Sequence, residues 1–303
     1  RDLERENLRR SRRGAPELQP AYTRADVERV FKQCSPQRYR QPFAIGEAGS
    51  VTFHDAGHIL GSAIVELTLQ EQGREKRLVF SGDLGKKDSV LLFDPEVLTR
   101  ADVVMMEGTY GDRDHRTLGN TLEQFEQVLS EAWERGGNVM IPAFAVGRTQ
   151  ELLFYLGQLH QQGKLDNWEV FLDSPMAIEV TRLYDRWLSQ LDCEGAKGLC
   201  SGDQTLLRDF LPRLRLTAST DESMMINKIK RGALIIAGSG MCTGGRIRHH
   251  FKQRIWDERN TLIFVGYQAR NTLGRILVDG VKRIKLFREE YLVRAQIETL
   301  GGF

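Results

Sequence analysis

The chain has 303 residues, 41% of them hydrophobic and 28% charged, with a formal net charge of +2. This apolar share supports a buried core and excludes a chain that is disordered throughout, while a length of roughly 150 residues per domain suggests two domains. No apolar run approaches the roughly 20 residues of a membrane helix, and the opening RDLERENLRRSRR has no signal-peptide pattern, so we expect no membrane association.

The near-neutral total conceals an uneven distribution of charge. Residues 1–40 carry a net +5 and residues 246–303 a net +6, whereas residues 41–245 carry −9. Basic ends allow contacts with phosphate but do not demonstrate them, because solvated surface charge explains them equally well. The four cysteines include no CxxC pair, which argues for a reducing compartment, and we expect a cytoplasmic protein.

Helix and strand signals alternate early in the chain. Residues 1–13 are predicted to form an arginine-rich helical segment, and Thr23 with Asp26 resembles a capping box that begins a second helix. Apolar and polar residues then alternate as in short strands. These predicted strands are residues 50–55, 63–69, 77–80 and 103–106, and their loops contain GHILGS, SGDLG and EGTYG.

After about residue 119 the pattern becomes strand, glycine, helix. The strands are NVMIPAF, EVFLD, RLRLTAS, ALIIAGSG and TLIFVGY, and helices are expected from about residues 119, 147, 175, 221 and 243. Ser174 as N-cap and Pro175 at the first helical position mark one helix start. Such alternation predicts a parallel sheet with helices on both faces, and the tail, 282–300, is predicted to form a closing hairpin.

Three strand-end loops each carry a residue of metal-ligand type beside glycine. These residues are His58 in DAGHILGS, Asp83 in FSGDLG and Glu107 in MMEGTYG. Loops at strand ends commonly build metal or phosphate sites, but a Gly-Asp or Gly-His turn can simply satisfy backbone groups. The six histidines include no HxH pair and no HEXXH. His54 and His58 are four apart but lie on a strand that enters a loop, so residue types alone assemble no two-metal site.

Taken together and in this order, the three loops resemble the metallo-β-lactamase fold in its β-CASP branch. They are similar to the third-motif histidine, the fourth-motif aspartate and the acidic motif A of that family. The segments IPAFAVGRTQELL, FLDSPMA, GSGMCTGGRIRHH and VGYQARNTLGR resemble its cap domain. The resemblance implies an α/β fold: a partial metallo-β-lactamase αββα sandwich in residues 1–111, then a β-CASP domain in 112–303 with a mainly parallel sheet flanked by helices.

The nearest relatives implied are bacterial and archaeal β-CASP ribonucleases and the endonuclease subunit of the polyadenylation machinery. The resemblance therefore implies zinc-dependent, endonucleolytic or exonucleolytic cleavage of RNA phosphodiesters. By it, His58 binds one zinc, Asp83 bridges two, and Glu107 is a carboxylate that orients a ligand histidine; Asp83 and Glu107 are the catalytic candidates. A bridging carboxylate holds two zinc ions roughly 3.5–4 Å apart, so a shared water loses its proton near neutral pH.

The chain also departs from the family pattern. The HxHxDH motif, which supplies most zinc ligands, is absent upstream of His58, and the chain stops at Phe303, where the motif B histidine normally follows. We expect a fragment of a longer protein that holds two of about seven ligands and no stable dinuclear zinc site.

Two strand-to-helix junctions of the cap region and one later loop are candidate phosphate sites. Helix N-termini there offer free N–H groups to phosphate, although tight turns of any such sheet look alike. The candidates for RNA or phosphate binding are Arg148, Thr149, Ser239, Thr243, Arg246 and Arg270. His249 and His250 are assigned to packing or surface, and Met224, Met225 and the four tryptophans to the core.

Alternatives remain open from the sequence. The chain could act as a non-catalytic RNA-binding clamp or inactive paralogue, or belong to a DNA nuclease or another hydrolase of this fold. Retention of His58, Asp83 and Glu107 favours the enzyme. Homo-oligomerisation stays an expectation that no motif decides.

Overall fold

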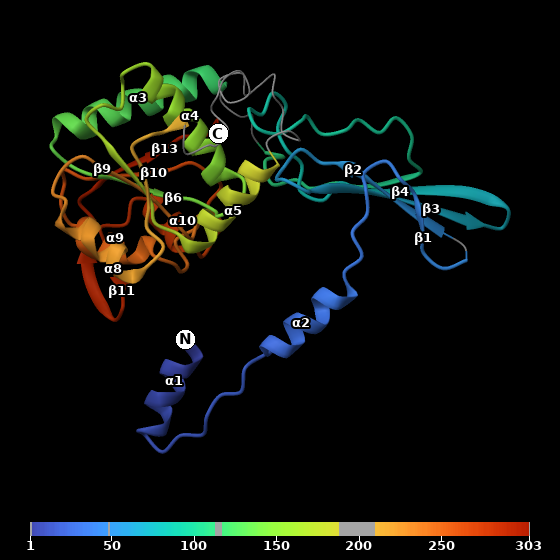
Figure 1. Cartoon of the computed structure of the whole chain (residues 1–303), viewed down its shortest axis with the longest axis horizontal. Coiled ribbons are helices and arrows are strands. Elements are labelled where there is room, and N and C mark those ends of the chain that lie inside the picture. Colours follow the sequence, from blue (N-terminus) through green and yellow to red (C-terminus); the bar gives the residue numbers. More distant parts are fainter. Residues whose placement is uncertain (1, 48, 113–116, 188–209, 303) are drawn as a thin grey trace.

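The computed structural model describes residues 2–47, 49–112, 117–187 and 210–302, arranged as two sheet-containing units (Figure 1). His115, Cys193 and Cys200 lie outside the described residues. The helices described are α1 (Asp2–Ser11), α2 (Arg24–Gln33), α3 (Leu118–Glu134), α4 (Arg148–Gln161), α5 (Pro175–Arg186), α8 (Thr220–Met225), α9 (Ile247–Arg254) and α10 (Leu273–Val278), with the 3-10 turn η2 (Ile226–Lys228).

The first unit is built on one twisted sheet in the order β1-β2-β3-β4-β5. Its strands are β1 (Phe43–Ala44), β2 (Gly49–Asp55), β3 (Ala63–Glu71), β4 (Arg74–Phe80) and β5 (Val103–Met105). β1 to β4 pair antiparallel, and β5 joins β4 in parallel. The strands predicted from alternating residues are confirmed, and the two-residue β1 is an addition that is too short to leave a sequence signal.

The second unit is an all-parallel sheet in the order β13-β10-β6-β9-β7-β8. Its strands are β6 (Val139–Pro142), β7 (Glu169–Leu172), β8 (Leu214–Leu216), β9 (Ala233–Ala237), β10 (Thr261–Phe264) and β13 (Gln296–Thr299). Helices cover both faces, with α3 and α4 on one side and α8 and α9 on the other (Figure 1). The predicted α/β class, with a mainly parallel sheet flanked by helices, is confirmed.

Alternate residues of each central strand belong to different cores. Leu234 and Ile236 of β9 pack with the α3–α5 side, whereas Ala233, Ile235 and Ala237 pack with the α9 and α10 side. Side chains along a strand point to opposite faces, so a strand buried on both faces must be apolar at every position. This explains the continuous run ALIIA, which is buried throughout.

The helix starts largely follow their capping signals. Thr23 and Asp26 form the expected capping box, and Ser174 caps α5 with Pro175 at its first position. The predicted start of α9 at about Thr243 is wrong, because the helix begins at Ile247. Gly245 adopts a left-handed φ of 73°, and a Cβ there would lie 2.1 Å from the Gly238 carbonyl oxygen, so this stretch forms a closed turn before the helix.

The tail differs from its prediction in one respect. A hairpin does form between β11 (Arg283–Leu286) and β12 (Glu289–Leu292). It stops there, and β13 then lies parallel to β10 at the edge of the second sheet. The pairing partner of β13 lies far back along the chain, so local pattern gave no sign of it.

Several side chains assigned to the core are on the surface. Trp168 is buried and Trp133 partly buried, but Met224, Met225, Trp187 and Trp256 are exposed. Helices α1 and α2 lie apart from both sheets in Figure 1, and α2 has no buried side chain. Among the described residues, no helix is long and apolar enough to cross a membrane.

A candidate active site between the two units

The loops that carry His58 and Asp83 touch each other. The Gly85 amide donates to the Ala56 carbonyl oxygen at 2.8 Å. A Cβ on Gly85 would lie 1.9 Å from the Gly57 carbonyl oxygen, so only glycine permits this approach. The structure therefore places the two predicted zinc ligands on adjoining loops, and both side chains are exposed.

Glu107 fixes the third loop against these two. Its Oε1 accepts from the Leu84 backbone amide at 2.6 Å, and its own amide donates to Ser81 Oγ at 3.0 Å. Partial burial raises the pKa of Glu107, but hydrogen bonds from Thr109 and Leu84, together with nearby His58, outweigh it and hold that pKa below its ordinary value. Glu107 is thus an ionised carboxylate that orders the Asp83 loop.

These residues do not by themselves form a zinc site. Among the described residues, no three histidine, cysteine, aspartate or glutamate side chains cluster as a metal site would require. His54 is no substitute, because its ring nitrogens contact Glu66 of β3 at 2.9 Å and Glu96 of the loop before β5 at 3.0 Å. His58 and Asp83 are suited to ligate zinc, but they need ligands from outside the described residues.

Helices α4 and α5 of the second unit contact the loops that carry His58 and Asp83. The buried Tyr184 hydroxyl of α5 accepts from the Leu60 amide at 3.3 Å, two residues after His58. Lys86, three residues after Asp83, donates to the Gly302 carbonyl oxygen at 2.6 Å and pairs with Glu151 of α4 at 3.7 Å. The ligand loops are therefore positioned by the rigid parallel-sheet unit.

The carboxyl ends of the parallel strands form the other wall of the site. Ligands of open α/β sheets commonly bind at this edge, where helix N-termini and loops converge. At the junction between β6 and α4, Arg148 begins the helix and pairs with Glu151. Thr149 is buried and donates its hydroxyl hydrogen to the Phe144 carbonyl oxygen at 2.6 Å. Thr149 therefore stabilises the turn and has no free hydroxyl hydrogen for a phosphate.

At the junction between β9 and α9, two hydroxyl groups lie side by side, whereas the arginine is bound within the fold. Ser239 and Thr243 lie together at the turn, with their oxygens 3.3 Å apart. Arg246 is committed within the fold, because it donates to Asp173 at 2.7 Å and to the carbonyl oxygens of Thr217 and Ala218. Its phosphate role stays a prediction, and any phosphate would compete with three hydrogen bonds already made.

Asp173 is the centre of a buried network that sequence analysis did not identify. This fully buried carboxylate accepts from Thr217, Ser223, Arg246 and His250. Burial raises its pKa, but hydrogen bonds from His250, Ser223 and Thr217 dominate and lower the pKa of Asp173 to about 2. Burial lowers the pKa of His250, against the opposing effect of Asp173. His250 is therefore a packed structural residue, as expected.

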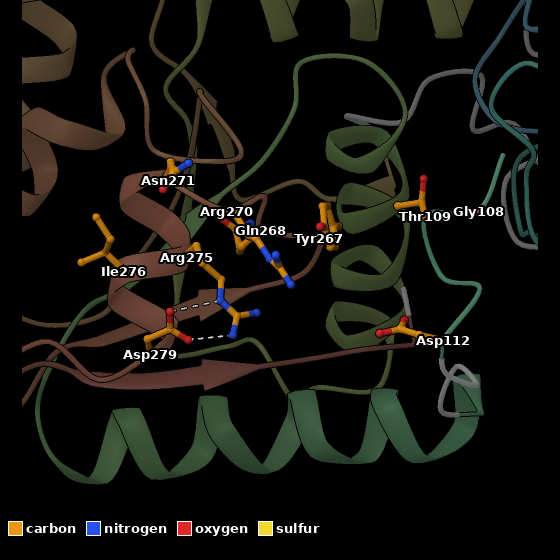
Figure 2. A pocket seen from close by; sticks show the side chains of 10 residues that line it. All are labelled: Gly108, Thr109, Asp112, Tyr267, Gln268, Arg270, Asn271, Arg275, Ile276 and Asp279. Carbon is orange, nitrogen blue, oxygen red and sulfur yellow. Dashed lines mark hydrogen bonds and ion pairs between the residues drawn. The ribbon is translucent and has the colours of Figure 1, made fainter.

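Arg270 lies in a pocket where the two units meet. The lining comes from the loop after β5 and from the segment between β10 and the end of α10 (Figure 2). The residues lining this pocket of about 660 Å³ are Gly108, Thr109, Asp112, Tyr267, Gln268, Arg270, Asn271, Arg275, Ile276 and Asp279. The pocket begins directly after Glu107, so it continues the candidate site.

Comparison with known proteins decides what this unit is. Residues 149–277 match the family model described as the Beta-Casp domain. The chain contains a Beta-Casp domain. The matched β-CASP residues include Thr149, Ser239, Thr243, Arg246 and Arg270, and they also include the Asp173 network. The resemblance seen in the sequence is confirmed.

Three relatives show how far the likeness extends. Ribonuclease TTHA0252 of Thermus thermophilus is 38% identical over 94% of this chain and 64% of its own length. Transcription termination factor FttA of Methanocaldococcus jannaschii is 34% identical over 93% of this chain and 45% of its own length. An RNase J-like protein of the same organism is 30% identical over 92% of this chain and 63% of its own length. The chain thus spans about half to two thirds of the length of these relatives.

Tyr267 and Asn271 of the pocket were not singled out from the β-CASP sequence. The segment VGYQARNTLGR carried the family resemblance, yet a single tyrosine in a loop has no distinctive spacing. Its role becomes visible only once the fold sets it against Tyr110, at a ring-centroid distance of 5.9 Å.

Proposed function

We propose that the protein hydrolyses RNA phosphodiester bonds in the cleft that begins at the three loops and continues into the pocket. The observation that carries this proposal is the meeting of the His58, Asp83 and Glu107 loops beside the carboxyl edge of the β-CASP sheet. Strand-end loops on a rigid scaffold are the usual location of catalytic groups. Relatives named as ribonucleases support the same substrate class.

Within this proposal the residues have separate tasks. His58 and Asp83 are two ligands of a zinc site that binds two metal ions when complete. Glu107 orders the Asp83 loop through the Leu84 amide and lies close enough to His58 for the two to interact electrostatically. A complete site would require further ligands from outside the described residues.

The finer properties are proposals as well. We place the protein in the cytoplasm, on the strength of its few cysteines. We favour RNA over DNA because of the relatives' names, and we leave the choice between endonucleolytic and exonucleolytic cleavage to experiment. Homo-oligomerisation is proposed only as a property to measure, by light scattering of the purified protein.

The direct test compares substrates and metal. The complete protein is incubated with end-labelled RNA and with DNA of the same sequence, each with and without EDTA. We expect cleavage of RNA that EDTA abolishes and added zinc restores, with DNA cleaved much more slowly. Equal cleavage of both polymers would contradict the RNA assignment, and cleavage unaffected by EDTA would contradict the metal requirement.

A second candidate is a clamp that binds RNA without cutting it. Two observations favour it: the described residues form no cluster of three metal-ligand side chains, and one relative is named a transcription termination factor. The same experiment separates the two. RNA that is bound in a gel-shift assay but stays intact with zinc present supports the clamp.

A further inference from the structure

We propose that the pocket after Glu107 is a subsite for one nucleotide of single-stranded RNA, whose base stacks on Tyr267 and whose backbone phosphate pairs with Arg270. This inference rests on the proposed function and names how that cleft holds its substrate. Three features support it: the exposed ring of Tyr267, the absence of any partner for Arg270 among the described residues, and the rigidity of the loop that carries both.

The ring of Tyr267 is open to a ligand. Tyr110 and Tyr267 come from the two different units and meet edge to face, with an interplanar angle of 79°. In such a pair the ring that presents its edge keeps both faces clear of its partner, and the other ring keeps one. Tyr267 is 38% exposed and Tyr110 36% exposed, which is far more than tyrosines fixed in a core. A base can therefore stack here without displacing a packed side chain.

The two arginines of the pocket differ in availability. Arg275 is held by Asp279, with a contact of 2.7 Å and a second hydrogen bond (Figure 2). Arg270 is exposed, and within the described part of the chain it forms no hydrogen bond or ion pair. Since Asp112 and Asp279 also line the pocket, its formal charges balance, so a phosphate alone gains little there. A nucleotide gains from the ring and from Arg270 together.

The loop that carries Tyr267 and Arg270 is held in place before any ligand arrives. The buried side-chain amide of Gln268 donates to the carbonyl oxygens of Gly240 and Gly266 at 3.0 and 3.1 Å. A Cβ on Gly274 would lie 1.7 Å from Gln268 Oε1, so glycine lets α10 close over this side chain. The loop is thus preorganised, which reduces the entropy lost when a ligand binds.

Single-stranded RNA fits these features better than a duplex does. Stacking on a protein ring requires an unstacked base, which a single strand provides and a helix withholds. The pocket also starts one residue after Glu107, so the bound nucleotide lies near the loops proposed for cleavage. The subsite would then help to select unpaired RNA and to position it.

Equilibrium binding by the complete protein tests the proposal. The probe is a short fluorescein-labelled oligoribonucleotide in EDTA, compared with a hairpin of the same composition and with an abasic ribose-phosphate oligomer. Stacking is worth about 1–3 kcal/mol per base, so Tyr267→Ala is expected to weaken binding of the single strand about 5- to 150-fold. Tyr267→Phe, which retains the ring, is expected to bind within about twofold of wild type.

Matched controls separate stacking and charge from a merely structural effect. Tyr22→Ala removes an exposed tyrosine outside the pocket, and Arg294→Ala removes an exposed arginine of the same basic region. Both are expected to leave single-strand affinity unchanged, whereas Arg270→Ala lowers it and flattens its salt dependence. On the abasic oligomer, Tyr267→Ala and wild type are expected to bind equally.

Two results would overturn the subsite: unchanged affinity of Tyr267→Ala for the single strand, or an equal loss for the abasic oligomer. Because binding is measured in EDTA, it is independent of cleavage. If RNA proves uncut with zinc present while the tyrosine effect holds, the subsite stands and the proposed hydrolysis fails.

Discussion

The two sheets of this protein differ in how much of themselves they bury. Strands β6, β9 and β10 of the parallel sheet are buried at every residue, and two large apolar cores lie on its two faces. In the first sheet, all three residues of β5 are exposed, and its own buried core consists of Ala56, Ile64 and Val79. Within the described residues, the parallel-sheet unit thus supplies most of the stability, since buried apolar area dominates folding.

The residues proposed for catalysis lie in the first unit, which buries less of its sheet. The predicted ligands His58 and Asp83, with Glu107, belong to the thinly packed unit, while α4 and α5 of the well-packed unit hold their loops through Glu151 and Tyr184. In the described residues, the well-packed parallel-sheet unit therefore supports the loops that carry the proposed ligands.

The largest difference is expected between a core and an edge substitution. Phe154 is fully buried and stacks on Phe210 at 5.4 Å, so Phe154→Ala should cost about 3–5 kcal/mol of unfolding free energy. Val104→Ala on exposed β5 should cost less than about 0.5 kcal/mol. Urea denaturation of the 303-residue chain measures both. Similar costs would show that β5 is packed as tightly as the core.

Acid should weaken the β-CASP domain through Asp173. Its pKa is about 2 in the fold against 3.8 when unfolded, so the unfolded state binds the proton more readily as pH falls. The stabilisation, about 2 kcal/mol, is complete above about pH 5 and is lost as pH falls through about 2. Stability curves of wild type and Asp173→Asn should converge in that range. A constant difference at every pH would contradict the assignment.

A single methyl group should disturb the site without unfolding the domain. Gly85→Ala places a Cβ 1.9 Å from the Gly57 carbonyl oxygen, so the Asp83 and His58 loops must separate. We expect RNA cleavage by the complete protein to fall at least about tenfold, because small misplacement of catalytic groups costs up to about 100-fold. Gly119→Ala, where the added methyl meets nothing, is the control. Unchanged cleavage by Gly85→Ala would separate these loops from the activity.

The smallest effect is expected at the exposed helix α2. Thr23→Ala removes the hydroxyl that accepts from the Asp26 amide, while the Thr23 amide still donates to the Asp26 carboxylate, and the loss should cost about 0.5–1 kcal/mol locally. Because α2 buries no side chain, hydrogen exchange should increase within that helix alone. If protection of the parallel sheet also falls, α2 is coupled to the β-CASP domain.

Features that depend on neighbouring residues were predictable from sequence. The caps at Thr23 and Ser174 and the apolar run of β9 specify their elements locally, and the structure confirms them. The start of α9 was not predictable, because the turn at Gly245 depends on a close approach to Gly238. The pairing of β13 with β10 likewise depends on residues about 35 positions apart.

In the candidate site, too, features that depend on distant residues were not predictable from the sequence. The relevance of His58, Asp83 and Glu107 followed from family resemblance, since their residue types alone assembled no site. Arg246 is a phosphate candidate from sequence because it lies at a strand-to-helix junction in the basic C-terminal region. Its partner Asp173 is 73 residues away and leaves no local signal. Arg270, by contrast, lacks any such partner in the described part of the chain, which only the fold could reveal.

The loops that meet at Glu107 form the proposed site of RNA cleavage. The most direct test is the single-turnover cleavage rate of labelled RNA by the complete protein carrying Asp83→Asn, with the exposed Asp221→Asn as control. We expect a fall on the order of 100-fold or more for Asp83→Asn, with RNA affinity retained, and no change for the control. Cleavage by Asp83→Asn at the wild-type rate would contradict it.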